Sequence, residues 1–230
     1  VLGQCIDILF IFGLVGGVAT SLGIGIPMIS AVASDLFGVA RGLPLDTAIL
    51  VGLTIVFSLS VGAGLDKGIK LLSDINVLLA IVLLGFILLV GPSTFIVNQA
   101  FDSLALMLQN FIEMSLRTDA GSSIGFAQDN TIFFWAWWMA WAPFMGLFVA
   151  RISGGRTIRQ VIIGVVGGGS LACWAGFSIL GHTTMHLTHN GHPGFSALLD
   201  GARAGEGFDG PRAVVELLHA LPLSPPITVV

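Results

Sequence analysis

The sequence predicts an all-α polytopic membrane protein, and three observations support this prediction. The 230 residues are 55% hydrophobic and only 10% charged, whereas a soluble domain carries about 25% charged residues. Their mean hydropathy is +0.96. The apolar residues also gather in runs of the length that a helix needs to cross a bilayer, about 20 residues. A chain so poor in charge is best solvated by lipid.

The apolar runs follow one another along the chain at residues 8–34, 44–65, 74–92, 131–150 and 160–182. Backbone polar groups inside a bilayer must be paired locally, so runs of this length are expected to be helices. None of the runs shows the alternation that strands of a membrane barrel require. The sequence therefore predicts five transmembrane helices.

The segments between the runs are more polar. Residues 92–116 have apolar side chains at helical spacing, which predicts an amphipathic helix along the outer membrane face, with a loosely ordered loop as the alternative. Residues 117–130 and 190–215 are interpreted as polar, Gly-rich connections. The chain starts at Val1 and stops inside what resembles a sixth apolar run, so we expect it to be an internal piece of a longer protein.

The basic residues predict an orientation. Lys67 and Lys70 follow the second run, and Arg151, Arg156 and Arg159 follow the fourth. Connections on the other side carry arginines that are outnumbered by acids. Because lysine and arginine are retained on the cytoplasmic side, the second and fourth connections are predicted to be cytoplasmic.

The net charge, the cysteines and the histidines argue against a nucleic-acid-binding, a disulfide-bonded and a metal-binding protein, respectively. A net charge of −4, without a Lys/Arg-rich run, offers no footprint for nucleic acid. Cys5 and Cys173 lie in apolar runs and are interpreted as small buried hydrophobes rather than a disulfide. The histidines at 182, 186, 189 and 192 have spacing that suits a metal, but no Cys, Asp or Glu completes a set, so exposed loop histidines are the favoured interpretation.

Glycines at four-residue spacing occur in two of the runs. Gly13 and Gly17 lie in the first run, and Gly164 and Gly168 in the fifth. This spacing favours close packing of helices in a membrane. The alternative is that glycines bend or loosen their helices, at Gly23 and Gly25 before Pro27 and at the run of residues 167–169.

The most informative segment is aromatic. Four of the five tryptophans fall between residues 133 and 144. At about 100° per residue, one helix face carries Trp137, Trp141, Phe144 and Phe148 within ~60°, and Trp138 lies ~60° to the side. Tryptophan faces attract cations, and aromatic cages hold quaternary ammonium groups. The alternative is an interfacial aromatic belt.

Two further features of the runs bear on mechanism. Pro143 interrupts the tryptophan helix, and broken helices at mid-membrane depth are where secondary transporters place their sites. None of the runs carries Asp, Glu, Lys or Arg near its middle, so a proton relay receives no support.

One long segment is similar to a known family. The residues from Trp135 to Arg159, WAWWMAWAPFMGLFVARISGGRTIR, resemble the signature helix and following loop of the betaine/choline/carnitine transporter family. Residues 19–25, 67–74 and 218–222 resemble further family segments. The resemblance covers essentially the whole chain and about the middle half of a family member.

The resemblance implies a leucine-transporter-like bundle of two inverted five-helix repeats. Residues 1–116 would hold the last three transmembrane helices of the first repeat and the external amphipathic helix. Residues 117–230 would begin the second repeat with the tryptophan-rich helix. It further implies a multi-pass protein of the cell (inner) membrane, a homotrimer, and no cofactor other than Na⁺ as the coupling ion.

The resemblance also assigns roles to residues. Trp138 resembles the aromatic-box tryptophan, Trp141 the residue under the bound ammonium, and Trp137 and Phe144 aromatics of the cytoplasmic pathway. Met145 stands where a sodium-independent carnitine carrier uses methionine to hold substrate. Sodium-coupled relatives place ion-binding side chains at the positions of Leu14, Val18 and Ser21, of which only Ser21 keeps an oxygen here. Exchangers place an arginine near Asn76, which this chain lacks.

The function implied is secondary active uptake of choline, glycine betaine, carnitine or a related osmolyte, by ion-coupled symport. One alternative is a sodium-independent exchanger of the same family. A second, from a different class, is a channel-like membrane protein, although no filter motif or row of pore-lining polar residues is visible. An enzyme is not expected, because the runs contain no paired nucleophile and base and no metal ligands at depth.

Overall fold

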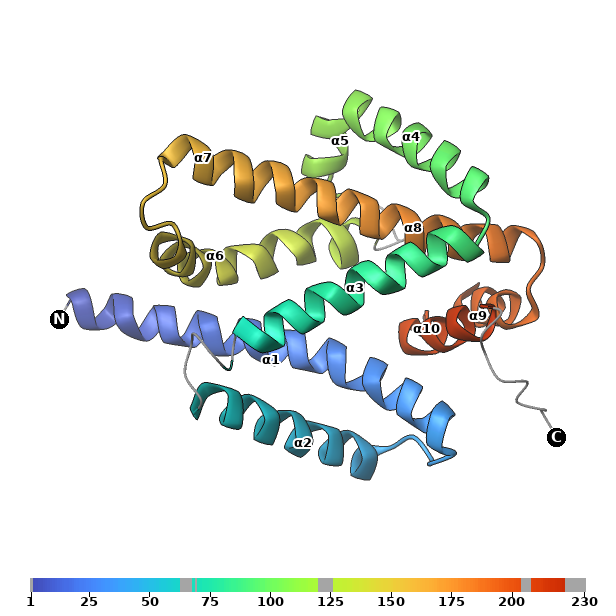
Figure 1. Cartoon of the computed structure of the whole chain (residues 1–230), viewed down its shortest axis with the longest axis horizontal. Coiled ribbons are helices and arrows are strands. Elements are labelled where there is room, and N and C mark those ends of the chain that lie inside the picture. Colours follow the sequence, from blue (N-terminus) through green and yellow to red (C-terminus); the bar gives the residue numbers. More distant parts are fainter. Residues whose placement is uncertain (1, 63–67, 69, 120–125, 204–207, 222–230) are drawn as a thin grey trace. The chain divides into compact units, whose positions relative to one another are not determined.

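The computed structural model describes residues 2–62, 68, 70–119, 126–203 and 208–221, and every regular element among them is a helix (Figure 1). Lys67, Pro222 and the predicted sixth run lie outside these residues. The described part includes α1 (Leu2–Phe37), α2 (Leu43–Gly62) and α3 (Lys70–Val90).

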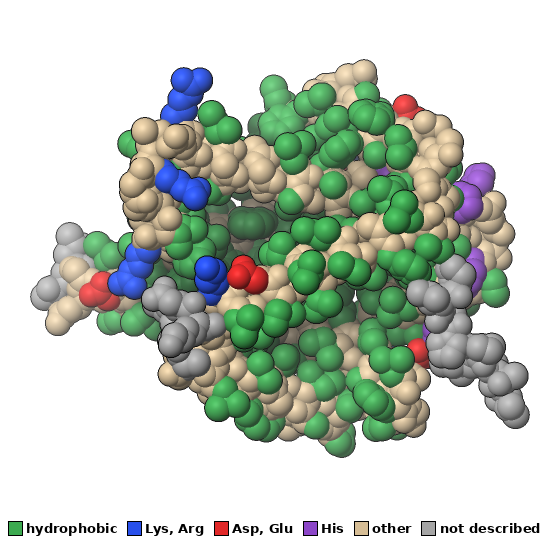
Figure 2. Space-filling model, in the orientation of Figure 1, with side chains coloured by type: hydrophobic (Ala, Val, Ile, Leu, Met, Phe, Trp, Pro, Cys, Tyr) green, Lys and Arg blue, Asp and Glu red, His purple; other side chains and the backbone are tan. Residues whose placement is uncertain are grey.

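Five helices are long and apolar enough to cross a membrane, by length and composition: Gly3–Phe37, Leu43–Gly62, Lys70–Val90, Gln128–Ile152 and Ile158–His189. They coincide with the five predicted runs, which confirms an all-α, multi-pass membrane protein. At most 6% of the most apolar part of each helix is buried, and apolar side chains are widespread on the face that Figure 2 shows. Apolar surface on this scale must be covered by lipid or by further protein.

Two of the membrane-length helices contain a wider, π-helical turn. The turn η2 (Gln128–Ile132) leads into α6 (Phe133–Ile152). Helix α7 (Ile158–Ile162) continues through η3 (Ile163–Gly168) into α8 (Gly169–His189). A Cβ built on Gly164 or Gly168 would meet no described atom within 4 Å. The wider turn η3 thus contains Gly164, Gly167 and Gly168. The packing predicted for Gly164 and Gly168 is not seen among the described residues.

The segment predicted as one amphipathic helix is two helices. Helix α4 (Ser93–Gln109) and α5 (Phe111–Leu116) are separated at Asn110, whose φ of −110° and ψ of 19° are not helical. The helical character of this segment is confirmed and the loosely ordered alternative is excluded for the described residues, but the predicted single helix is wrong and its place along the outer membrane face stays a prediction. The break follows from residue 110 because asparagine competes for backbone hydrogen bonds, and its Nδ2 donates to the Leu106 carbonyl.

Residues 190–215, interpreted as a connection, contain helix α9 (Pro193–Arg203) and the start of α10 (Gly210–His219). Asp209 caps α10 by accepting from the Arg212 amide, with Pro211 in the first turn. The two helices share a small apolar core built from Phe195, Leu198 and Leu217, against which Leu180, Leu187 and Ala213 pack. Tertiary burial thus stabilises helices too short to stand alone.

The chain divides into two compact units, residues 1–23 with 101–173 and residues 24–100 with 174–230. In the second unit, His219 Nε2 lies 2.8 Å from Asp35 Oδ2, and Arg41 Nη1 lies 3.6 Å from Asp209 Oδ2. These two contacts connect α10 to the end of α1 and to the turn that follows it. The division of the sequence at residue 116 into two repeats concerns internal symmetry, which these units do not address, and it stays a prediction.

Candidate functional site

The tryptophan-rich helix α6 lies in the first unit, and its aromatic rings form two groups. The first group surrounds Trp137: the ring centroids of Phe133, Phe134 and Trp138 lie 5.9, 5.8 and 6.4 Å from it. These separations and tilted planes are typical of attractive aromatic pairs. Trp138 is 60% exposed, whereas Trp137 is half-buried. The Trp137 Nε1 atom is buried and has no hydrogen-bond acceptor among the described residues.

The second aromatic group lies further along α6. The Trp141 and Phe144 rings are T-shaped with centroids 5.7 Å apart, and Phe144 stacks on Phe148 at 6.5 Å. Trp141, Phe144 and Met145 are each half-buried. This group follows the face that the helical wheel predicted. The predicted interruption at Pro143 is not seen, because α6 continues without a break from Phe133 to Ile152 with Pro143 inside it.

Helix α1 approaches this second group through its glycines. A Cβ built on Gly17 would lie 3.0 Å from Trp141 Nε1, and one built on Gly13 would lie 3.8 Å from the Ala140 carbonyl oxygen. Gly17 is buried. The predicted close packing is confirmed at Gly17, where a Cβ would crowd the Trp141 ring, whereas at Gly13 a Cβ would make only an ordinary contact with α6.

Ser21, the residue predicted to bind the coupling ion, lies one turn after Gly17 on α1. Ser21 is half-buried and its hydroxyl donates to the Gly17 carbonyl at 3.0 Å. The hydroxyl oxygen keeps lone pairs that can accept a cation. Leu14 and Val18 supply no oxygen from their side chains. Ser21 and Trp141 thus both contact Gly17 of α1, Ser21 through its hydroxyl and Trp141 through its ring. The roles of Ser21 and Trp141 stay predictions.

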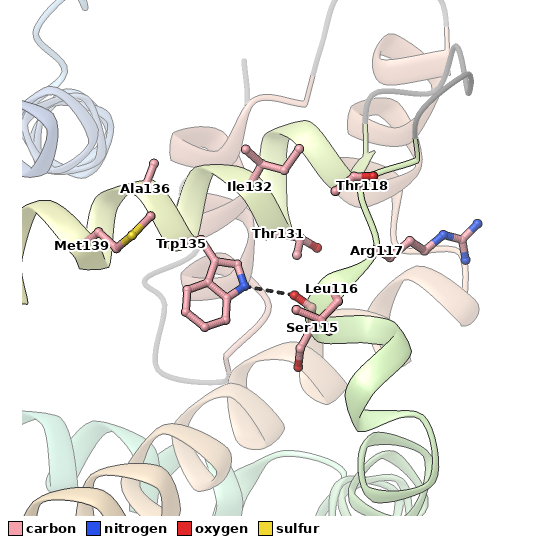
Figure 3. A pocket seen from close by; sticks show the side chains of 9 residues that line it. All are labelled: Ser115, Leu116, Arg117, Thr118, Thr131, Ile132, Trp135, Ala136 and Met139. Atoms are coloured by element: carbon pink, nitrogen blue, oxygen red, sulfur yellow. Dashed lines mark hydrogen bonds between the residues drawn. The ribbon is translucent and has the colours of Figure 1, made fainter.

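Trp135 was not among the predicted site residues, but its surroundings are distinctive. Its Nε1 donates to the Ser115 carbonyl at 3.0 Å, which joins α6 to the end of α5 (Figure 3). Recesses of about 380 and 400 Å³ flank the indole. Both are open, and their walls are mainly apolar. A hydrogen bond to a backbone carbonyl leaves no mark in the sequence, so this contact was not predictable from it.

Arg117 lines the first recess but is directed away from Trp135 (Figure 3). Its Nε lies 2.6 Å from Asp119 Oδ1. The Asp119 carboxylate raises the pKa of the Arg117 guanidinium, first through this hydrogen bond and then through its charge, and Glu113 adds to the effect. The guanidinium is therefore already engaged by carboxylates.

The structure contradicts part of what was predicted for the cysteines and histidines. Cys5 and Cys173 are exposed and free of a disulfide, so their predicted burial is wrong: the helices that carry them are largely uncovered. The histidines at 182, 186 and 189 belong to α8 rather than to a loop. Those at 182, 186 and 192 are half-buried rather than exposed as predicted, and His186 contacts Asn190 and the Phe95 ring. Among the described residues, no cluster of three or more His, Cys, Asp or Glu could hold a metal.

Comparison with known proteins identifies the family of this chain. The family described as BCCT, betaine/carnitine/choline family transporter, matches residues 1–230. The glycine betaine transporter OpuD of Bacillus subtilis (strain 168) is 40% identical over 192 residues, which cover 83% of this chain and 38% of that relative. The matched part of the chain thus covers well under half the length of this relative. Since the match extends from the first residue to the last, the chain belongs to the betaine/carnitine/choline family of transporters.

Proposed function

We propose that the complete protein is a secondary transporter of the cell membrane that takes up a quaternary-ammonium osmolyte by ion-coupled symport. The substrate class comprises choline, glycine betaine, carnitine and related compounds. A relative 40% identical over 192 residues is named a glycine betaine transporter, which supports this class. Family membership supports transport rather than an enzymatic reaction.

The observation that carries the proposal is the position of the Trp141 indole, which is half-buried and belongs to a membrane-length helix. The indole lies between Gly17 of α1 and the Phe144 ring. A trimethylammonium group carries a permanent charge but no N–H donor, so it cannot make the oriented hydrogen bond to a carboxylate that a primary ammonium makes. It gains more from aromatic faces, which attract cations by about 0.5–2 kcal/mol each, depending on desolvation. We assign Trp141 and Trp138 to the ammonium, and Trp137 and Phe144 to the cytoplasmic pathway.

For the coupling ion we propose sodium, with Ser21 as a ligand. The support is its position one turn from Gly17, next to the proposed ammonium site. Other ligands would come from helices outside this chain. We further propose a homotrimer, which rests on family membership alone.

A second candidate is a sodium-independent exchanger of the same family. It is favoured by two features: Leu14 and Val18 offer no side-chain oxygen, and Met145 lies half-buried on α6, one residue after Phe144. An exchanger would be stimulated by substrate preloaded on the opposite side, whereas a symporter would respond to a sodium gradient.

The test is uptake of labelled choline, glycine betaine and carnitine by the full-length protein, with and without sodium. Trp141→Ala is expected to abolish uptake while membrane insertion stays intact, because the ammonium loses its aromatic face. Trp135→Phe, whose side chain is bonded to Ser115 outside the proposed site, should keep it. Undiminished uptake by Trp141→Ala would remove Trp141 from the site. Equal uptake in sodium-free buffer, stimulated by preloaded substrate, would replace symport by exchange.

A further inference from the structure

The closest approach between α1 and α6 is made by a residue without a side chain. Gly17 is buried, and a Cβ placed on it would lie 3.0, 3.2 and 3.4 Å from Nε1, Cε2 and Cδ1 of Trp141. All three atoms belong to the five-membered ring of the indole. That ring therefore lies directly against the backbone of α1.

A methyl group at this position would force a shift, because carbon atoms normally approach such a ring no closer than about 3.5 Å. The indole must then turn about its side-chain torsions, or α6 must move away. Either change disturbs Phe144, whose ring is T-shaped against Trp141 at 5.7 Å. Overpacking of this kind is accommodated by off-rotamer side chains and backbone shifts.

We propose that Gly17 is a positioning residue that sets the orientation in which Trp141 presents its indole to the quaternary ammonium. This inference rests on the proposed function, since it gives Trp141 its role. Gly17 does not touch the substrate. It acts through Trp141 by leaving space for the five-membered ring, which limits the torsion angles that the side chain can adopt.

Neighbouring glycines of α1 differ in this respect and provide matched controls. A Cβ on Gly13 would meet the Ala140 carbonyl oxygen at 3.8 Å, an ordinary van der Waals contact, and a Cβ on Gly16 would meet no described atom within 4 Å. Alanine is also the better helix former at all three positions. A defect specific to position 17 therefore cannot arise from helix propensity.

The experiment compares Gly17→Ala with Gly16→Ala and Gly13→Ala in the full-length transporter, at saturating sodium. We expect Gly17→Ala to raise the KM for the transported quaternary ammonium on the order of tenfold, with the maximal rate per molecule at the membrane changing less than about twofold. The two control variants should keep the wild-type KM. Saturating sodium separates this effect from any change at Ser21, whose hydroxyl donates to the Gly17 carbonyl.

A second comparison covers the case in which Gly17→Ala alone reaches the membrane poorly. Trp141→Phe removes Nε1, the atom nearest to the new methyl group, while keeping an aromatic face. We expect Trp141→Phe to raise KM by itself, and adding Gly17→Ala to raise it little further. Such non-additivity is the mark of two residues in direct contact.

The outcomes separate this inference from the proposed function. If Trp141→Phe raises KM but Gly17→Ala behaves like Gly16→Ala, Gly17 has no positioning role and the proposed site stands. If the two effects simply multiply, the inference is likewise overturned. If neither variant at position 141, Phe nor Ala, changes uptake, the proposed site itself is lost and the positioning role with it.

Discussion

Individual tryptophans of α6 differ in what they contact, and only part of this difference can be predicted from their spacing within the helix. Helical spacing placed Trp141 and Phe144 on one face, and the structure has both half-buried. Trp138, to the side of that face, is 60% exposed. The contact with Gly17 was not predictable, because spacing within one helix does not specify which glycine of another helix it meets. The spacing of Gly13 and Gly17 predicted a close approach of another helix but did not specify which helix.

The two tryptophans on either side of Ala136 allow a matched prediction about stability. Trp135→Phe removes a donor that is bonded to the Ser115 carbonyl, which should lower the stability by about 1 kcal/mol. Trp137→Phe removes a buried N–H that has no acceptor among the described residues, and relief of its desolvation should offset the lost packing. Melting of the purified full-length variants in one detergent measures both. A larger loss for Trp137→Phe would contradict this account.

At the scale of helices, the long apolar elements were predictable and the short ones were not. A run of about 20 apolar residues matches the thickness of a bilayer, so the five membrane-length helices could be predicted from composition alone. Helices α9 and α10, of 11 and 10 residues, depend instead on a tertiary core around Phe195 and Leu217. The sequence did hold one local signal, Asp209 followed by Pro211, which is typical of a helix start.

That capping residue gives a prediction about α10. Asp209→Ala removes the acceptor for the Arg212 amide and should destabilise the helix by about 1 kcal/mol. Asp209→Asn keeps a good cap but loses the charge facing Arg41, 3.6 Å away. Because exposed ion pairs contribute little, we expect the Asn variant to resemble the parent protein. Hydrogen exchange of the α10 amides distinguishes the two variants. Equal acceleration in both would mean that the ion pair, not the cap, holds the helix.

For the whole molecule, charge rather than packing determines the predicted orientation. The turn between α6 and α7 lies among Arg151, Arg156 and Arg159, with no acidic residue between 150 and 160. The arginines near α9 and α10 instead have acidic partners: Arg203 lies 3.5 Å from Asp200, and Arg212 lies 3.7 Å from Glu216. The uncompensated arginine cluster should therefore remain in the cytoplasm.

Single cysteines test this orientation in the full-length protein after Cys5 and Cys173 are replaced by serine. Gly154, in the α6–α7 turn, and Ala197, on α9, are both exposed, so thiols placed there can react. In intact cells, a membrane-impermeant maleimide should label the Ala197→Cys variant and should label Gly154→Cys only after permeabilisation. The two positions lie on either side of one membrane-length helix, Ile158–His189, so they must face opposite compartments if that helix spans the bilayer. Labelling of both from outside would show that it does not span, and the reverse pattern would invert the orientation.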